Sequence, residues 1–168
     1  VGLSFRIWGG DNQDRYPMKV PNSEGGTAGN LANNTLIYTH YMVLSNELNT
    51  PKVVVCPSDE RTARTNFFGP PLATADFRSN EAISYFLGYE ADETQPQMLL
   101  SGDRNIGNGN PIANYGYSPL ATVTTGARYG LGTNVPTTFG WSDKMHQKQG
   151  NVCLADGSVQ QLSSAKTV

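Results

Sequence analysis

Two runs of alternating apolar and polar residues meet at Asp156-Gly157, between residues 150 and 162. Alternation is typical of β-strands that bury one face. Asp-Gly is among the pairs that favour a two-residue type I′ turn, in which both central residues have positive φ. The sequence therefore predicts an antiparallel hairpin here, and the rest of the chain must cover its apolar face.

Helices are predicted in two places. Leu3, Ile7 and Trp8 have the spacing of one helical face, which predicts a helix over about residues 1–12. A glycine pair and then a proline follow, and they end the pattern. Residues 35–48 have nearly helical apolar spacing and predict a second helix, with Asn33 or Asn34 as its N-cap.

The remaining elements are short strands separated by loops. Apolar and β-branched runs predict strands at 52–56, 83–89 and 97–102, in addition to the hairpin. The 18 glycines and 10 prolines favour turns over long helices, and many of the glycines lie in a predicted long loop, 103–138. We therefore expect one α+β domain over residues 1–168, with a helix packed on a small antiparallel sheet.

Charge and length exclude several classes of protein. Only 15% of the residues are charged and the net charge is −2, which argues against a nucleic-acid surface because such a surface needs clustered Lys and Arg. The chain of 168 residues is long enough to bury a single core. It opens on Val1 within an amphipathic pattern, so we expect a piece of a longer chain, whose other part could hold anchors or targeting signals.

His146 precedes Asp156-Gly157 with nine residues between them. Three other motifs precede this one in order: Phe5-Arg6-Ile7-Trp8 running into 11–17, Val55-Cys56-Pro57-Ser58-Asp59, and Ile83-Ser84-Tyr85-Phe86. Together they resemble the prepilin-type "H-x9-DG" family, pseudopilin-like proteins related to subunits of type II secretion and type IV pilus systems. The resemblance covers nearly the whole chain except residues 104–138.

The resemblance implies a structural role without catalysis. Members of this family carry a leader that the prepilin peptidase removes and a long hydrophobic helix, which anchors the precursor in the inner membrane. The helix at 1–12 would then be the last part of that helix, and the remainder a pilin-like head on the periplasmic or extracellular side. The implied partners are other pilin or pseudopilin subunits.

His146 and Asp156 have two interpretations. They could form a catalytic or metal-binding pair, or His146 could pin the start of the hairpin while Asp156 and Gly157 serve its turn. The turn itself explains Asp156, and a hydrolytic dyad would also need a nucleophile and an orienting group. We therefore predict structural roles for these residues and no enzymatic activity.

Cys56 and Cys153 are the two cysteines of the chain, and each lies in a predicted strand. In a secreted head domain such a pair readily forms a disulfide. The alternative is two buried free thiols packed as small apolar side chains. Two cysteines alone would be an incomplete zinc site. We expect both residues to be structural, with the disulfide favoured.

No cofactor is required by these patterns, although calcium is one option. Residues 103–110 and the acidic turn 90–93 place oxygen-bearing side chains in loops, as calcium sites do. Asn and Gly are equally explained as turn formers, so calcium stays the weaker alternative. A second function also stays open, a secreted or cell-surface module that recognises polysaccharide through aromatic, Asn- and Gly-rich loops.

Overall fold

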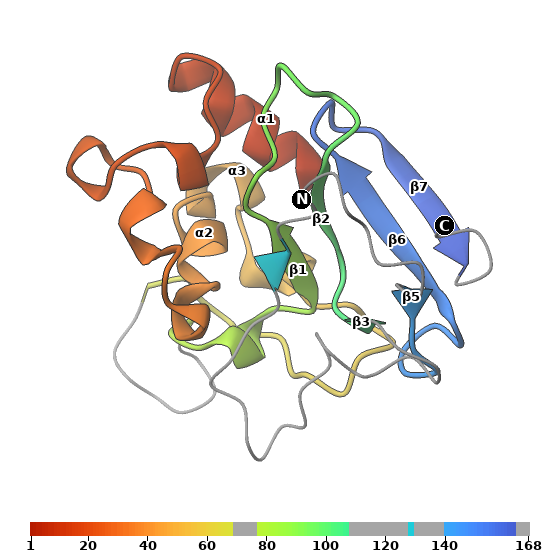
Figure 1. Cartoon of the computed structure of the whole chain (residues 1–168). Helices are drawn as coiled ribbons and strands as arrows, with labels where there is room; N and C mark the ends of the chain where they lie inside the picture. The colour runs from red at the N-terminus through yellow and green to blue at the C-terminus, as the bar shows by residue number, and fades with distance from the viewer. Residues whose placement is uncertain (69–76, 108–127, 130–139, 164–168) are drawn as a thin grey trace.

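A computed structural model describes residues 1–68, 77–107, 128–129 and 140–163 (Figure 1). An N-terminal helix is followed by a region of short helical turns and then by the strands of a sheet. The helices are α1 (Gly2–Asp11), α2 (Thr39–Met42) and α3 (Ser45–Leu48), and the six 3-10 turns are η1 (Pro17–Lys19), η2 (Asn22–Glu24), η3 (Ala28–Asn30), η4 (Asn34–Leu36), η5 (Pro51–Val54) and η6 (Asn80–Ala82). The strands are β1 (Tyr85–Gly88), β2 (Leu99–Asp103), β3 (Ile106–Gly107), β4 (Arg128–Tyr129), β5 (Gly140–Trp141), β6 (Gln149–Leu154) and β7 (Val159–Ser163).

The main sheet has the strand order β4-β1-β2-β6-β7. β1, β2, β6 and β7 pair antiparallel with their neighbours, while β4 pairs parallel with β1. A small second sheet joins β3 and β5 antiparallel. The predicted α+β class with an antiparallel sheet is therefore confirmed, and the parallel edge strand β4 is an addition that the sequence did not indicate.

The predicted hairpin is present, but its turn differs from the predicted type I′. The N–H of Gly157 donates to the carbonyl of Leu154, and the N–H of Leu154 donates to Ser158, each at 2.9 Å. Gly157 has a φ of +83°, whereas Asp156 is not among the residues with positive φ. The three-residue loop is thus a type I turn closed by a glycine bulge, which places only Gly157 in the left-handed region.

α1 confirms the predicted N-terminal helix, although its buried face differs from the expected one. Phe5 and Trp8 enter the main core, as do the small residues around them, whereas Leu3 and Ile7 are 69% and 48% exposed. Phe5 makes edge-to-face ring contacts with two core tyrosines. The helix thus carries apolar side chains on both faces. Within the described ranges, no helix has the length and apolar character needed to cross a membrane.

The single helix predicted over 35–48 is wrong. The segment forms η4, α2 and α3, three short pieces separated by turns. The predicted N-cap is confirmed at Asn33, whose side-chain oxygen accepts the N–H of Thr35 at 2.9 Å. Thr, Tyr and Asn are frequent in this segment and have low helix propensity, so packing of the buried side chains determines its path.

The strand predicted over 52–56 is also wrong. Thr50 caps a 3-10 turn, η5, by accepting the N–H of Lys52, and Pro51 occupies its first position. Proline has a fixed φ that suits this position, so Thr50-Pro51 starts a turn before the β-branched run can extend. Val54 is buried, while Val53 is 43% exposed.

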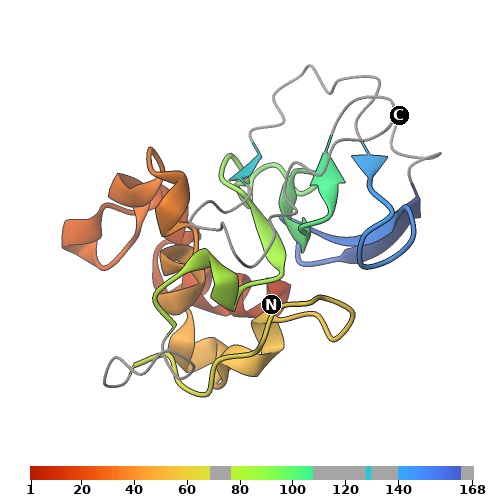
Figure 2. The ribbon, with the colours of Figure 1, turned by 90° about the horizontal axis from the view of Figure 1, so that it is seen from below.

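The two faces of the main sheet are covered differently. The larger cluster of buried side chains lies on the face that carries α1 and the short helices. On the other face, a smaller cluster forms around Trp141 of β5 and includes Phe86, Ile106, Val152 and Leu154. Figure 2 shows α1 on one side of the sheet, with β3 and β5 on the opposite side.

His40 is a buried histidine within the larger core region and should make stability depend on pH. Its Nδ1 lies 2.6 Å from Thr27 Oγ1, and its Nε2 has no hydrogen-bond partner among the described residues. Burial lowers the pKa of His40 to about 4, so below pH 6.5 the unfolded chain binds a proton that the folded chain does not.

We expect the loss of unfolding free energy between pH 7 and pH 4.5 to be smaller in His40→Gln than in the wild type, by about 2–3 kcal/mol. Urea denaturation at the two pH values measures this difference, and the comparison cancels the carboxylates that titrate in both proteins. Equal losses in both proteins would contradict a neutral buried imidazole.

Candidate functional site

Three side chains from distant parts of the chain lie close together: Cys56, Asp103 and His146. The Sγ atom of Cys56 lies 3.3 Å from His146 Nε2, and this same nitrogen lies 3.5 Å from Asp103 Oδ2. The three ligand-type atoms lie within 4.8 Å of one another. In the part of the chain that the structure describes, this is the one group of three or more His, Cys, Asp or Glu side chains so close together.

Each of these residues lies beside or at the end of a helical turn or strand. Cys56 follows η5, Asp103 is the last residue of β2, and His146 lies in the turn that leads into β6. Three non-glycine neighbours of His146 adopt positive φ values: Met145 (62°), Gln147 (51°) and Lys148 (64°). Such conformations are uncommon and strained for residues with side chains, and they often cluster at functional sites. The backbone on both sides of His146 therefore has an uncommon conformation of the kind found at functional sites.

Asn151 of β6 fixes the carboxylate of Asp103. Its backbone N–H and its side-chain amide both donate to Asp103 Oδ2, at 2.6 and 3.0 Å. This contact follows from the sheet, because β2 and β6 are paired neighbours. Burial raises the pKa of the Asp103 carboxyl, although the hydrogen bonds from Asn151 and the nearby His146 oppose this effect. Burial likewise raises the pKa of the Cys56 thiol, and the Asp103 carboxylate adds to this effect.

A buried ion pair lies beside the cluster. Arg104 Nη2 and Nε donate to the two oxygens of Asp59 at 2.6 and 2.7 Å, and both side chains are at most 2% exposed. Burial alone would raise the pKa of Asp59, but the hydrogen bonds and the charge of Arg104 outweigh it and lower the pKa. The pair thereby neutralises one carboxylate next to the site and leaves Asp103 as the acidic group of the cluster.

The cluster lines a pocket of about 380 Å³. Cys56, Asp103 and His146 contribute to its wall, as do Gly2 of α1 and Cys153 of β6. His146 is 24% exposed, while Asp103 is 2% exposed. A small molecule or ion could therefore reach the three side chains from the pocket.

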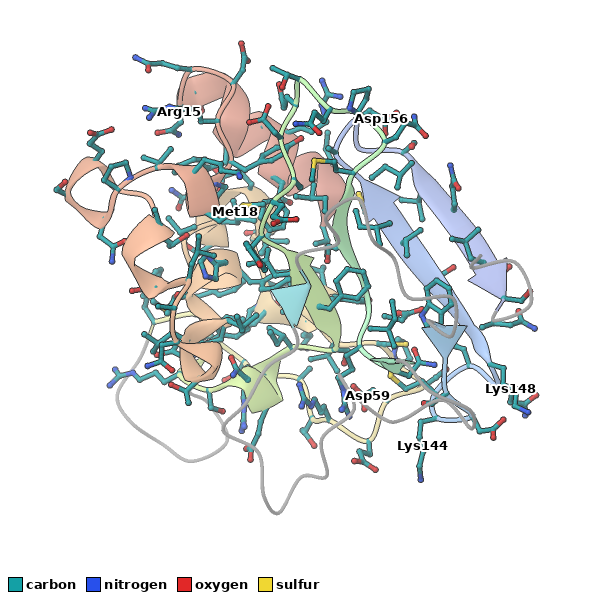
Figure 3. All side chains as sticks on the ribbon, viewed as in Figure 1. Arg15, Met18, Asp59, Lys144, Lys148 and Asp156 are labelled. Carbon is teal, nitrogen blue, oxygen red and sulfur yellow. The ribbon has the colours of Figure 1, made fainter. Side chains whose placement is uncertain are left out.

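His146 and Asp156 do not form the pair that one interpretation of the sequence suggested. The nine residues between them include all of β6, and a strand of this length separates its ends by about 20 Å. In Figure 3, Asp156 lies at the end of the hairpin opposite Lys144 and Lys148. Asp156 Oδ1 instead accepts the N–H of Ser158 at 2.8 Å, and Gly157 has the positive φ of the turn.

The disulfide expected between Cys56 and Cys153 is not formed, and both cysteines are free and buried. The Cys153 thiol donates to the carbonyl of Leu154 and faces α1, where a Cβ on Gly2 would lie 2.2 Å from the sulfur. The Cys56 thiol faces His146 instead. The two sulfurs therefore have different partners, and the alternative of two free thiols describes this structure.

The two loops considered for calcium have other contacts in the described residues. Asp103 is bound by Asn151, and Arg104 by Asp59. Residues 108–110 of the first loop lie outside the described residues, as does most of the predicted 103–138 loop. In the acidic turn, Asp92 accepts the N–H and hydroxyl of Thr94, while Glu93 pairs with Arg6 at 3.9 Å.

A second hollow of about 400 Å³ contains the residue types expected of the polysaccharide-binding alternative. Its wall includes three asparagines and the 67% exposed ring of Phe68. Most of the predicted 103–138 loop, with further aromatic residues such as Tyr115 and Tyr117, lies outside the described residues.

The geometry of the Cys56 cluster determines which chemistry it can support. A catalytic Cys-His-Asp arrangement uses both ring nitrogens, one facing the nucleophile and the other facing the carboxylate. Here the same atom, Nε2, faces both Cys56 Sγ and Asp103 Oδ2. Three different donor atoms within 4.8 Å of one another are instead a set that a metal ion can bind. Sulfur, imidazole nitrogen and carboxylate oxygen are together ligands typical of zinc.

Sequence reasoning named all three residues but did not bring them together. The sequence predictions pair Cys56 with Cys153 and His146 with Asp156, and they place Asp103 in a loop considered for calcium. The missing step is the pairing of the 97–102 strand with the hairpin, which the sequence predictions do not specify. Pairing these strands brings Asp103 beside Asn151, five residues after His146.

No family model matches the chain, and no curated protein or solved structure is significantly similar to it.

Proposed function

We propose that this chain is the globular head of a pilin-like filament subunit with a structural, non-catalytic role. The observation that carries the proposal is the two-sided apolar character of α1. One face of the helix enters the core of the head, while Leu3 and Ile7 face outward. A helix of this kind can bind its own head and a neighbouring subunit at the same time.

Contacts among the four motifs support the resemblance on which the proposal draws. Arg6 of the first motif donates to the carbonyl of Asp156 in the last motif. Cys56 of the second motif contacts His146. The N–H of Ser84 in the third motif donates to the carbonyl of Val54, next to the second, at 2.8 Å. Motifs that are far apart in the sequence thus form one connected unit around α1 and the hairpin.

Leu3 and Ile7 are four residues apart and form one stripe along the exposed side of α1. Exposed apolar side chains that are grouped in this way indicate an interaction site. In the proposed filament, this stripe contacts the helix of another copy of the chain. The low content of charged residues, 15%, lets neighbouring heads lie close together without strong repulsion.

The proposal predicts that Leu3→Lys/Ile7→Lys abolishes assembly without unfolding the head. The test uses the parent reading frame, with the segment that precedes Val1, in a host that has a prepilin peptidase. Lysine has a helix propensity close to that of leucine, so α1 is retained. A loss of about 1.4 kcal/mol per contact lowers an association constant about tenfold, and contacts repeat along a filament. Sheared fractions and electron microscopy measure filament yield, and thermal melting checks the fold.

Phe68→Lys is the matched control, because it removes a large exposed apolar side chain from a different surface. We expect this variant to assemble normally. An unprocessed product that does not enter the membrane, or unchanged assembly of the double variant, would contradict the proposal. Polysaccharide binding by the wild type that is lost only in Phe68→Lys would instead support the binding-module alternative.

A further inference from the structure

The cluster of Cys56, Asp103 and His146 is not used by a filament subunit whose contacts are made by α1. All three side chains are polar or titratable, and two of them are buried. Burying such groups side by side costs free energy unless they have partners. Asn151 supplies partners to the Asp103 carboxylate, and a ligand that joins all three side chains would also give one to the Cys56 thiol and the His146 ring.

We propose that Cys56, Asp103 and His146 bind one zinc ion, with a fourth position open to the pocket. In tetrahedral zinc sites, bond lengths of about 2.3 Å to sulfur and about 2.0–2.1 Å to nitrogen or oxygen separate the ligand atoms by about 3.5 Å. The sulfur-to-nitrogen and nitrogen-to-oxygen distances here are 3.3 and 3.5 Å. These two pairs are thus already spaced as a tetrahedral ion would hold them, and the third pair, Cys56 with Asp103, lies within 4.8 Å.

The surroundings of the three ligands fit this role. Asn151 donates twice to Asp103 and orients its carboxylate, as outer partners of metal ligands commonly do. The neighbouring cation, Arg104, is held by Asp59, so its charge is neutralised by a carboxylate that the ion does not need. The adjacent pocket of about 380 Å³ gives water access to the fourth position.

Charge balance also favours the ion. Zinc binding replaces the proton of the Cys56 thiol, which passes to solvent, and the thiolate and the Asp103 carboxylate together match the two positive charges. The neutral imidazole of His146 completes the protein ligands. Calcium and magnesium prefer sets of oxygen ligands, so thiol and imidazole donors favour zinc over these ions.

The test uses the purified chain in the presence of a non-thiol reductant, with zinc and cobalt salts as probes. We expect one zinc per chain in a competition titration with a chromogenic chelator. Cobalt should produce the intense absorption of a cobalt–thiolate bond, which reports ligation by a cysteine in the wild-type protein. Zinc should also raise the melting temperature, because it binds the folded state.

Variants assign the ligands. Cys56→Ser and His146→Gln should each weaken zinc binding by more than about 100-fold, whereas Asn151→Ala should weaken it by about 10-fold, as an outer partner does. Cys153→Ala is the matched control, because Cys153 is the other free thiol on the wall of the same pocket. It should leave the affinity and the cobalt absorption unchanged.

Three outcomes would overturn the proposal: no zinc bound by the wild type, a cobalt complex without thiolate absorption, or binding that Cys153→Ala removes and Cys56→Ser does not. Circular dichroism of the metal-free variants shows whether each one folds. The cobalt spectrum of the wild type decides the thiolate ligand even if a variant does not fold.

Discussion

Arg104→Ala should lower the free energy of unfolding by about 3–5 kcal/mol, because it leaves a buried carboxylate without its partner. Asp59 has a fully buried side chain, and Arg104 supplies two short hydrogen bonds to it. The alanine variant must either bury an unpaired charge or bind a proton that the wild type does not bind. Urea denaturation at neutral pH, followed by circular dichroism, measures the loss.

Glu24→Gln is the control for this result. Glu24 pairs with Arg15 at 3.5 Å, and the two side chains are 55% and 40% exposed. Exposed pairs of this kind contribute about 0–1 kcal/mol. A loss in Arg104→Ala as small as the loss in Glu24→Gln would contradict the structural role of the buried pair.

The stabilisation that the Arg104–Asp59 pair gives to the fold should depend on pH. Because Arg104 lowers the pKa of Asp59 in the folded state, its stabilisation is present above the ordinary carboxyl pKa. It is lost as pH falls through the lowered value. Arg104→Ala should therefore lose less stability on acidification than the wild type.

Trp141→Ala should be about as destabilising, with a loss of about 3–5 kcal/mol, the range for removing a buried tryptophan. Trp141 is 1% exposed and is the largest fully buried side chain among the described residues. It belongs to the smaller cluster on the face of the sheet opposite α1. Because the chain has two tryptophans, circular dichroism is a safer measurement than fluorescence for this variant.

A double variant tests whether the Trp141 indole packs directly against Gly150 of β6. A Cβ on Gly150 of β6 would lie 1.7 Å from Trp141 Nε1, so Gly150→Ala cannot be accommodated while the indole stays in place. Overpacking of this kind costs about 1–3 kcal/mol. In the Trp141→Ala background, Gly150→Ala should cost much less. Additive losses of unfolding free energy would show that the indole does not lie over β6 in solution. Phe68→Ala is the control, because it removes an exposed aromatic ring, and it should be nearly neutral.

The elements that the sequence predicted well have strong local signals. The hairpin of β6 and β7 combines alternation with Asp156-Gly157, and α1 combines helical spacing with Gly9-Gly10 near its end. Even there, the choice of which side chains are buried depends on tertiary structure. Leu3, Ile7 and Trp8 have the spacing of one face, yet of these only Trp8 is buried, and Phe5 joins it in the core. Periodicity indicates that a face exists, but not which of two apolar faces the core selects.

The wrong predictions have different physical causes. At 52–56 a β-branched run was outweighed by Thr50-Pro51, which starts a 3-10 turn. At 35–48 apolar spacing predicted one helix, but many residues of this segment have low helix propensity. The packing of buried side chains such as Ile37, Tyr41 and Leu44 therefore determines the path of the backbone. In both segments short-range turn chemistry or long-range packing overrides the average preference of the run.

The site was less predictable than the fold because its members come from three separate segments. Cys56, Asp103 and His146 meet only when η5, β2 and the turn before β6 are all in place. The register of β2 against β6 decides where Asp103 lies, and this register includes a bulge between Leu99 and Ser101. Sequence spacing cannot specify such a bulge. The backbone bend around His146 is likewise visible only in its positive φ values.

The contacts between α1 and the hairpin have a mechanical consequence. Arg6 and Tyr16 donate to two successive carbonyls, those of Asp156 and Ala155, at the closed end of the hairpin. Tension applied along α1 is therefore transmitted into the β6–β7 ladder through this point and through the buried rings of Phe5 and Trp8. We therefore expect a force that pulls on α1 to load the sheet as well as the helix.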